Sequence, residues 1–518
     1  MRRVLFALIL AMPTVAAADL WTRALPDAGG GGGSGSAASS SIDEDADLIA
    51  WAGESKPISL GELLQLAVRQ SPALQNAKID IAVAEAQVSE TWARHDWLVQ
   101  AQGTGSEQHG FFSGIRYTSR AYGVTGDISR VLPTGGTIDL HVSSQYQHSE
   151  SSIAKATNVT EDWLDTVQGS ITQPLLKGRG EYLYDANERK LSLIRDEAVL
   201  ARRLSAINTM QTVISAYWDL VLAERQVAIT RASLDLAHER LRVTQIGAQG
   251  GKVAQAEIPA VEQIIATREE DVLNGELAVL NASIALRRTV GMPIGPGELG
   301  LRVPEDLDTR DRGWTLQPLL ERAWAASPEL AQLAKQDQSA SIDIQVTENG
   351  LLPQLDAALS LGPVGQSSGF TDALNDMVQF KALQAQGSLT FSRSLHQYDV
   401  RGKSRELRTA REKIRVNAFD ISAQYAQAMA RAVAQIELAR RRVVLSQRAI
   451  DLANENIRIE TDRFNLGKST NFDVLNRLEE LRQAELRKAQ AMIDWHKAEA
   501  TVQALTGDIV ADYGVTID

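Results

Sequence analysis

Two very long segments of this 518-residue chain, residues 181–246 and 403–466, contain neither glycine nor proline. Both residue types interrupt helices, proline because it lacks an N–H group and glycine because it loses more backbone entropy on folding. Each segment could therefore run as a helix about 95–100 Å long, at 1.5 Å per residue. Because this is several times the usual helix length, we expect an elongated, mainly helical protein.

The apolar residues of both segments recur every seven positions, in two rows. A strict seven-residue period predicts a left-handed coiled coil. The two rows lie roughly 200° apart around the helix axis, so each helix would be packed on opposite sides. This arrangement favours a wall of helices that closes into a tube. The rows are Leu220, Val227, Leu234 and Leu241 with Leu222, Ile229, Leu236 and Val243, and then Ile436, Val443, Ile450, Ile457 and Phe464 with Leu438, Leu445, Leu452, Ile459 and Leu466.

The two segments also belong to a longer repeat. A fixed shift places the second set of rows on the first and Gly467-Lys468 on Gly251-Lys252, and Ser327-Pro328 has a counterpart in Ser71-Pro72. We interpret this as an internal duplication, with repeats at 57–304 and 314–518. Each would contain a helix, strands (about 97–176 and about 353–393), a long helix, a tip (250–252 and 466–468) and a return helix.

Residues 1–18 have the pattern of a secretory signal peptide, with two arginines, an apolar run and three alanines. Residues 19–56 have the glycine-rich, acidic composition of a flexible linker. The chain has no cysteine, and its net charge of −12 comes from interspersed acidic and basic residues, which does not suggest a nucleic-acid partner. The histidines lack metal-ligand spacing and no phosphate-binding loop is present. We expect no enzyme activity, no cofactor and no metal.

Between the helical segments, six runs alternate apolar with small polar residues, which predicts strands with one polar face. Each run is about ten residues long, enough to cross a bilayer when tilted. We expect a tight turn at 133–136 and long polar loops at 105–118, 149–164 and 362–378, the asymmetry of an outer-membrane barrel. Six strands cannot enclose a lumen, so several chains would have to contribute.

These features together resemble the outer-membrane efflux channel family, the TolC-like outer-membrane factors, over about 57–518. The most specific pieces are the two Ser-Pro pairs, Leu351-Leu352-Pro353-Gln354-Leu355, Gln173-Pro174-Leu175-Leu176 and Phe464-Asn465-Leu466-Gly467-Lys468. The resemblance implies a mainly α protein with membrane β: a homotrimeric α-barrel of coiled-coil helices continuing into a transmembrane antiparallel β-barrel. If the extra hairpin at 133–136 joins it, a trimer would have eighteen strands instead of the usual twelve.

The resemblance also implies a function and a location. The family forms passive exit ducts in the outer membrane of Gram-negative bacteria, with the helical part in the periplasm. These ducts dock a periplasmic adaptor and an inner-membrane pump in tripartite efflux or type I secretion systems. The cargo is chosen by the pump, and nothing in this sequence specifies it.

Asp473 matches the acidic position that narrows the family's channel entrance, and Glu257 is its counterpart in the first repeat. Three chains would place rings of carboxylates at the constriction and favour cations. Alternatively, both are ordinary first-turn helix acids stabilised by the helix dipole. Asn476, Phe464 and Ser469 stand where the family has a second acid, a gate tyrosine and a gate arginine. Because of these departures the family's hydrogen-bonded latch does not carry over to this chain, which leaves closure by packing as one alternative and the closing mechanism open.

The two tips carry the remaining candidate site residues. Gly251 and Lys252 in the first repeat, and Leu466, Gly467 and Lys468 in the second, would contact the adaptor. The plain alternative is a helix–helix turn with a left-handed glycine. For the whole chain, the other hypotheses are a periplasmic coiled-coil adaptor or scaffold that does not conduct, and a soluble coiled coil without a true signal peptide. Neither requires six alternating strands.

Overall fold

The computed structural model describes residues 57–112, 115–153, 156–251, 253–295, 299–303 and 313–514. The predicted signal peptide (1–18), the linker (19–56) and Lys252 lie outside the described residues. The long helices are α5 (Ala186–Gln249) and α10 (Tyr398–Asn465), and their return helices are α6 (Glu257–Val290) and α11 (Asn471–Thr506). The shorter elements are α2 (Leu60–Gln70), α3 (Pro72–Glu90), η1 (Thr91–His95), α4 (Glu181–Tyr184), α7 (Leu316–Ala326), α8 (Pro328–Asn349), α9 (Phe370–Val378) and α12 (Ile509–Asp512).

The helix boundaries follow local signals in the sequence. Pro72 and Pro328 stand at the first position of α3 and α8, where the missing N–H is not needed. Both return helices end at a left-handed glycine, Gly291 with φ 87° and Gly507 with φ 74°. Only glycine adopts this conformation without strain, so these positions stop the helices.

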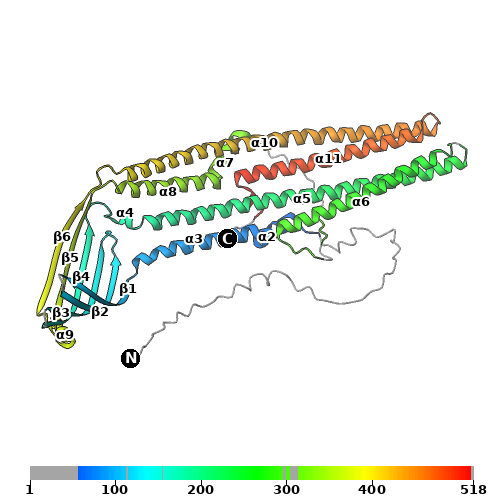
Figure 1. Ribbon diagram of the computed structural model, residues 1–518. Helices are drawn as coiled ribbons and strands as arrows, with labels where there is room; N and C mark the ends of the chain where they lie inside the picture. The colour runs from blue at the N-terminus through cyan, green and yellow to red at the C-terminus, as the bar shows by residue number, and fades with distance from the viewer. Residues whose placement is uncertain are drawn as a thin grey trace, which may run out of the picture. The chain divides into compact units, whose positions relative to one another are not determined.

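The helices lie side by side in one layer (Figure 1). Near the sheet their order is α3, α5, α8, α10, and towards the tips it is α6, α5, α11, α10. The long helix α5 therefore packs between two neighbours, as its two apolar rows predict. In α10 the row through Ile436 faces α11 and is buried or half-buried, whereas the row through Leu445 is exposed.

The main core lies where α2, α5 and the ends of α6 and α11 meet. It contains fully buried large side chains, among them Leu63, Met210, Leu220, Leu286 and Ile493. A second cluster joins α7, α10 and α11 around Met429 and Val502. Both clusters lie far along the helices from the sheet, so the middle of the layer is the most densely packed part of the described chain.

Six strands form one antiparallel sheet in the order β1 to β6. The two predicted repeats thus contribute to one sheet, in which β4 of the first pairs with β5 of the second. The hairpin through Gly135 (φ 86°) joins β2 to β3, which places it inside this sheet. The strands are β1 (Leu98–Phe112), β2 (Ile115–Val131), β3 (Thr137–Ile153), β4 (Ala156–Pro174), β5 (Gln354–Ser367) and β6 (Ala382–Ser392).

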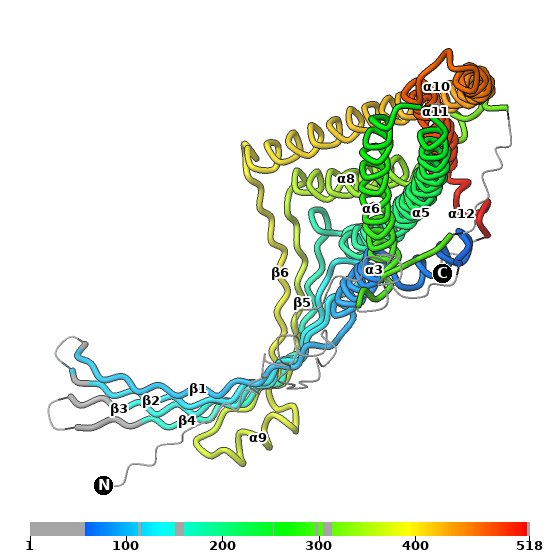
Figure 2. Tube along the Cα trace, turned by 90° about the vertical axis from the view of Figure 1, so that its right-hand side faces the viewer, coloured from blue at the N-terminus to red at the C-terminus, as the bar shows by residue number. Residues whose placement is uncertain are grey.

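The prediction of long polar loops between the strands is wrong. Residues 105–112 and 115–118 continue β1 and β2, 149–153 and 156–164 continue β3 and β4, and 362–378 contains the end of β5 and all of α9. Figure 2 shows the long arms of β1 to β4. The polar residues there pair across strands as well as apolar ones do, because the ladder uses backbone groups. Their polarity therefore shows that the strands continue past the apolar part of the sheet.

The two faces of the sheet differ in chemistry. One registered row runs across all six strands through Val99, Ile128, Leu140, Gly169, Leu361 and Ala385. Residues one step along each strand point to the other face and are polar, such as Gln100, Asp127, His141 and Gln168. We call the first face, with its exposed valines, leucines and isoleucines, the apolar face.

Within the described residues, none of the helices combines the length and the apolar composition needed to span a membrane.

Candidate functional site at the hairpin tips

The α5–α6 and α10–α11 hairpins end at the same end of the layer, far from the sheet (Figure 1). Each turn contains a left-handed glycine, Gly251 with φ 68° and Gly467 with φ 69°. Gly251, Leu466, Gly467 and Lys468 are exposed. These residues are therefore available to a partner, and the turn geometry explains the glycines equally well.

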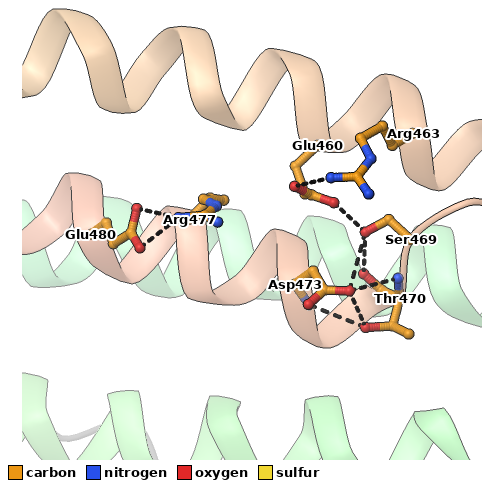
Figure 3. Close-up of polar contacts among 7 residues, drawn as sticks. All are labelled: Glu460, Arg463, Ser469, Thr470, Asp473, Arg477 and Glu480. Carbon is orange, nitrogen blue, oxygen red and sulfur yellow. Dashed lines mark hydrogen bonds and ion pairs between the residues drawn. The ribbon is translucent and has the colours of Figure 1, made fainter.

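Asp473 is held by the start of its own helix (Figure 3). Its Oδ2 accepts hydrogen bonds from the Thr470 N–H at 3.0 Å, the Thr470 hydroxyl at 2.7 Å and the Ser469 hydroxyl at 3.2 Å. The Asp473 N–H donates in return to Thr470 Oγ1 at 3.3 Å, which completes a capping box. These hydrogen bonds, chiefly from the Thr470 hydroxyl, hold the pKa of Asp473 below its ordinary value.

Ser469 connects Asp473 to a buried carboxylate. Its hydroxyl also contacts Glu460 near the end of α10. The side chain of Glu460 is only 9% exposed and pairs with Arg463 at 3.4 Å. Asn476, one turn into α11, is exposed.

Glu257 has a different environment from Asp473. It is the first residue of α6, and the N-cap residue Ala256 makes no side-chain capping bond. One carboxylate oxygen of Glu257, Oε2, is buried without a hydrogen-bond partner in the described part of the chain. Arg240 of α5 lies close enough for its charge to interact with that of Glu257.

Arg240 joins the two hairpins and was not singled out from the sequence. Only 8% of the residue is exposed, and its guanidinium lies over the ring of Phe464, 4.0 Å from the centroid. Its Nε donates to Oδ1 of Asn471 at the start of α11. Asn471 Nδ2 in turn donates to Thr244 Oγ1 at 2.6 Å. Burial lowers the pKa of Arg240, and Glu257 opposes this shift.

A second arginine connects the two hairpins farther from the tips. Arg268 of α6, 6% exposed, donates to Ser233 of α5 at 2.6 Å and to Glu479 of α11 at 3.2 Å. Between the two arginines, Ala237, Val261, Ile265 and Leu475 form a small apolar cluster. Within one chain, the two hairpins are thus held by buried hydrogen bonds as well as by packing.

A sequence signal for Arg240 exists. Ser233, Ala237, Arg240 and Thr244 are all buried and follow the four-three-four spacing of a coiled-coil seam. A charged residue on such a seam has to find partners, which points to a specific contact. Among the described residues, no group of three or more His, Cys, Asp or Glu could hold a metal ion.

The sequence profile described as "outer membrane efflux protein" matches residues 319–508. That segment, which includes all of α10 and α11, is similar to the outer membrane efflux proteins. The predicted resemblance to the outer-membrane efflux channels is thereby confirmed. No curated protein matches the chain.

Solved structures extend the likeness to the whole fold. The outer-membrane channel OprN aligns with a TM-score of 0.65 at 13% identity, covering 86% of this chain and 89% of its own. VceC of Vibrio cholerae aligns at 0.63 and 13% identity, covering 86% and 96%, respectively. The Campylobacter jejuni channel CmeC aligns at 0.64 and 12% identity, covering 89% and 86%. At this identity the likeness establishes a shared fold, that of an outer-membrane channel.

Proposed function

We propose that this chain is the outer-membrane channel of a tripartite efflux or type I secretion system. Three copies form a passive exit duct whose sheet lies in the outer membrane of a Gram-negative bacterium and whose helices lie in the periplasm. The hairpin tips dock a periplasmic adaptor and, through it, an inner-membrane pump. The family match and the shared channel fold support the efflux role and the location.

The observation that carries the proposal is a sheet with one apolar face and two open edges. Among the described residues, β1 and β6 each pair with one other strand, and every residue of β6 is exposed. In hydrocarbon, unpaired backbone groups are too costly, so a membrane sheet has to close. Pairing β6 of one copy with β1 of the next closes it, and three copies then supply eighteen strands. Barrels of this size leave an aqueous channel.

The helical layer has matching open edges. Leu438, Leu445, Leu452, Ile459 and Leu466 of α10 keep between 44% and 70% of their surface exposed along one seven-residue row. The opposite edge presents Ile79 and Val83 of α3 and Leu273 and Leu277 of α6, all about half exposed. When each copy contacts the next through two different surfaces, the copies form a ring if their successive rotations complete a full turn. The α10 edge of one copy would therefore pack against the α3 and α6 edge of the next.

At the tips, the same ring would bring three copies of Asp473 and Glu257 together. The lowered pKa of Asp473 keeps its carboxylate charged over the physiological range, so the entrance would favour cations. A non-conducting adaptor would share the hairpins, but it would have no use for a six-stranded sheet with an exposed apolar face.

The test is to purify the full chain from bacterial membranes and measure its mass and conductance. We expect outer-membrane fractionation, a native mass of three copies, and cation-preferring current in a planar bilayer. A stable trimer without current would favour a scaffold, and a water-soluble monomer would refute both the duct and the ring.

A further inference from the structure

The short helix α9 lies between β5 and β6 and packs flat on the sheet, against β4 and β5 (Figure 2). It lies on the apolar face, because Phe370 contacts Trp163 with ring centroids 5.1 Å apart, and Trp163 shares a face with Val167 and Ile171. Gly365 permits this approach, since a Cβ there would collide with the carbonyl oxygen of Ala373. The helix is therefore fixed to the outer surface of the proposed barrel.

Its position along the strands is at the end of the apolar zone. The row beneath its N-terminus is aromatic, with Tyr122, Tyr146 and Trp163 in neighbouring strands. The next row outward is charged: Arg120 donates to Glu107 at 2.8 Å, and His148 contacts Glu161 at 3.0 Å. Aromatic residues followed by charged ones mark the boundary between hydrocarbon and headgroups.

The thickness of the zone agrees with a membrane. Towards the helices, the other boundary is Trp97, with Arg130 over its ring. The charged residues at the two boundaries, Arg120 and Arg130, are ten residues apart on β2, or about 33 Å along the strand. A strand tilt of about 40° reduces this to about 25 Å, the height of the apolar band of outer-membrane barrels. The helices leave from the Trp97 end, so α9 lies at the outer leaflet.

The helix itself is two-sided. Ala373 and Met377 are buried against the sheet. Phe370, Leu374 and Val378 form an adjacent stripe that stays between 39% and 64% exposed, and Phe380 follows it. Asp372, Asn375, Asp376 and Gln379 occupy the opposite flank. An amphipathic helix in an aromatic boundary row is suited to lie in the membrane interface.

The residue beneath α9 gives a second, independent reason for its place. Asp165 belongs to the apolar face, yet the residue is only 2% exposed, and both carboxylate oxygens are buried without a hydrogen-bond partner among the described residues. A bare carboxylate facing acyl chains is unfavourable. Because α9 covers Asp165, the outer surface at this point consists of the apolar residues of α9 instead of a carboxylate.

We propose that α9 is a lipid-contacting interfacial helix, whose Phe370, Leu374 and Val378 stripe inserts among the acyl chains of the outer leaflet next to the headgroups. The continuity of this stripe with the aromatic row singles out lipid as the partner. A second copy of the chain is a poorer occupant, because α9 packs on β4 and β5, whereas copies meet at β1 and β6. The inference rests on the proposed membrane barrel.

The chain has no cysteine, so a single substitution gives a unique labelling site. Val378→Cys would carry an environment-sensitive nitrobenzoxadiazole dye in proteoliposomes. Gln379→Cys, the next residue and about 100° around the helix, is the matched control, and Leu359→Cys reports the apolar face itself. Quenching by iodide in water is compared with quenching by a lipid that carries a doxyl group near its headgroup.

We expect the label at Val378→Cys to be quenched at least several-fold more by the doxyl lipid than by iodide, and Gln379→Cys to show the reverse. Equal iodide quenching at both positions overturns the interfacial helix. Protection of Val378→Cys from both quenchers means that protein covers it, which also overturns the proposal. If Leu359→Cys is not quenched by lipid, the membrane barrel itself fails, so the two failures are distinguishable.

Discussion

The two hairpin tips have similar turns, but the acidic residue that follows each turn has different contacts. Both long helices end in a left-handed glycine, and both return helices begin with an acid in the first turn. In the second tip that acid, Asp473, is bound in a capping box. In the first tip, Glu257 follows an uncapped Ala256 and has a buried, unpartnered oxygen near Arg240. Corresponding positions in two similar hairpins can thus stabilise their own helix or contribute to a contact between hairpins.

The largest effect is expected from removing the contact between the tips. Arg240→Ala deletes a buried guanidinium that donates to Asn471 and lies over Phe464. Hydrogen bonds to charged groups contribute about 1.5–3 kcal/mol. Hydrogen–deuterium exchange should therefore rise roughly ten- to a hundredfold in both tips.

The matched control is Arg242→Ala, two residues along α5. The side chain of Arg242 is 62% exposed and pairs with Glu239 on its own helix. Such exposed pairs contribute at most about 0.5 kcal/mol. If both variants exchange alike, Arg240 does not connect the hairpins.

The cap of the second tip should have an intermediate effect. Thr470→Ala removes the hydroxyl that bonds Asp473 and its N–H. Loss of an N-cap should raise exchange at the start of α11 by about fivefold and leave the first tip unchanged. The reverse change, Ala256→Ser, should do little, because Ala256 has helical φ and ψ of −66° and −13°, where a serine cannot cap. A strong gain of protection there would mean that the tips differ only in sequence, not in backbone geometry.

The sequence predicted the long helices, the glycine turns and the strands, because each depends on local periodicity or backbone freedom. It mispredicted the strand ends, since residues such as Ser149 to Ser152 are polar yet pair through their backbones. Arg240 was missed because its partners, Asn471 and Thr244, come from segments that only the packed helices bring together. Likewise, α9 was taken for part of a loop, since its apolar stripe spans only two turns.

Lowering the pH should change hydrogen exchange in the second tip through protonation of Asp473. Its pKa lies below the ordinary value of 3.8, so the ionised group stabilises the capped helix start above that pH. This stabilisation is lost as the pH falls through the lowered pKa. After correction for intrinsic rates, exchange at the start of α11 should increase below pH 3.8 in the parent chain. In the Asp473→Asn variant this acid-induced increase in exchange should be absent. An identical acid response in both proteins would assign it to another group.

The smallest effect is expected in ion selectivity. Asp473→Asn should reduce cation preference more than Glu257→Gln does, because part of the Glu257 carboxylate is buried. The change in permeability ratio should be about twofold at low salt and smaller at high salt because of screening. Reversal potentials in planar bilayers measure it. Equal and negligible shifts would leave both acids as ordinary first-turn helix residues.

The association of copies through the exposed row of α10 is tested most directly by one pair of variants. Leu452→Asp places a charge in the middle of that row, where the side chain is 58% exposed in the single chain. Asn454→Asp adds the same charge two residues away, on another exposed side of the helix. Native mass spectrometry of the purified proteins should give monomers for Leu452→Asp and trimers for Asn454→Asp. Intact trimers from both variants would contradict the ring of helices on which the duct depends.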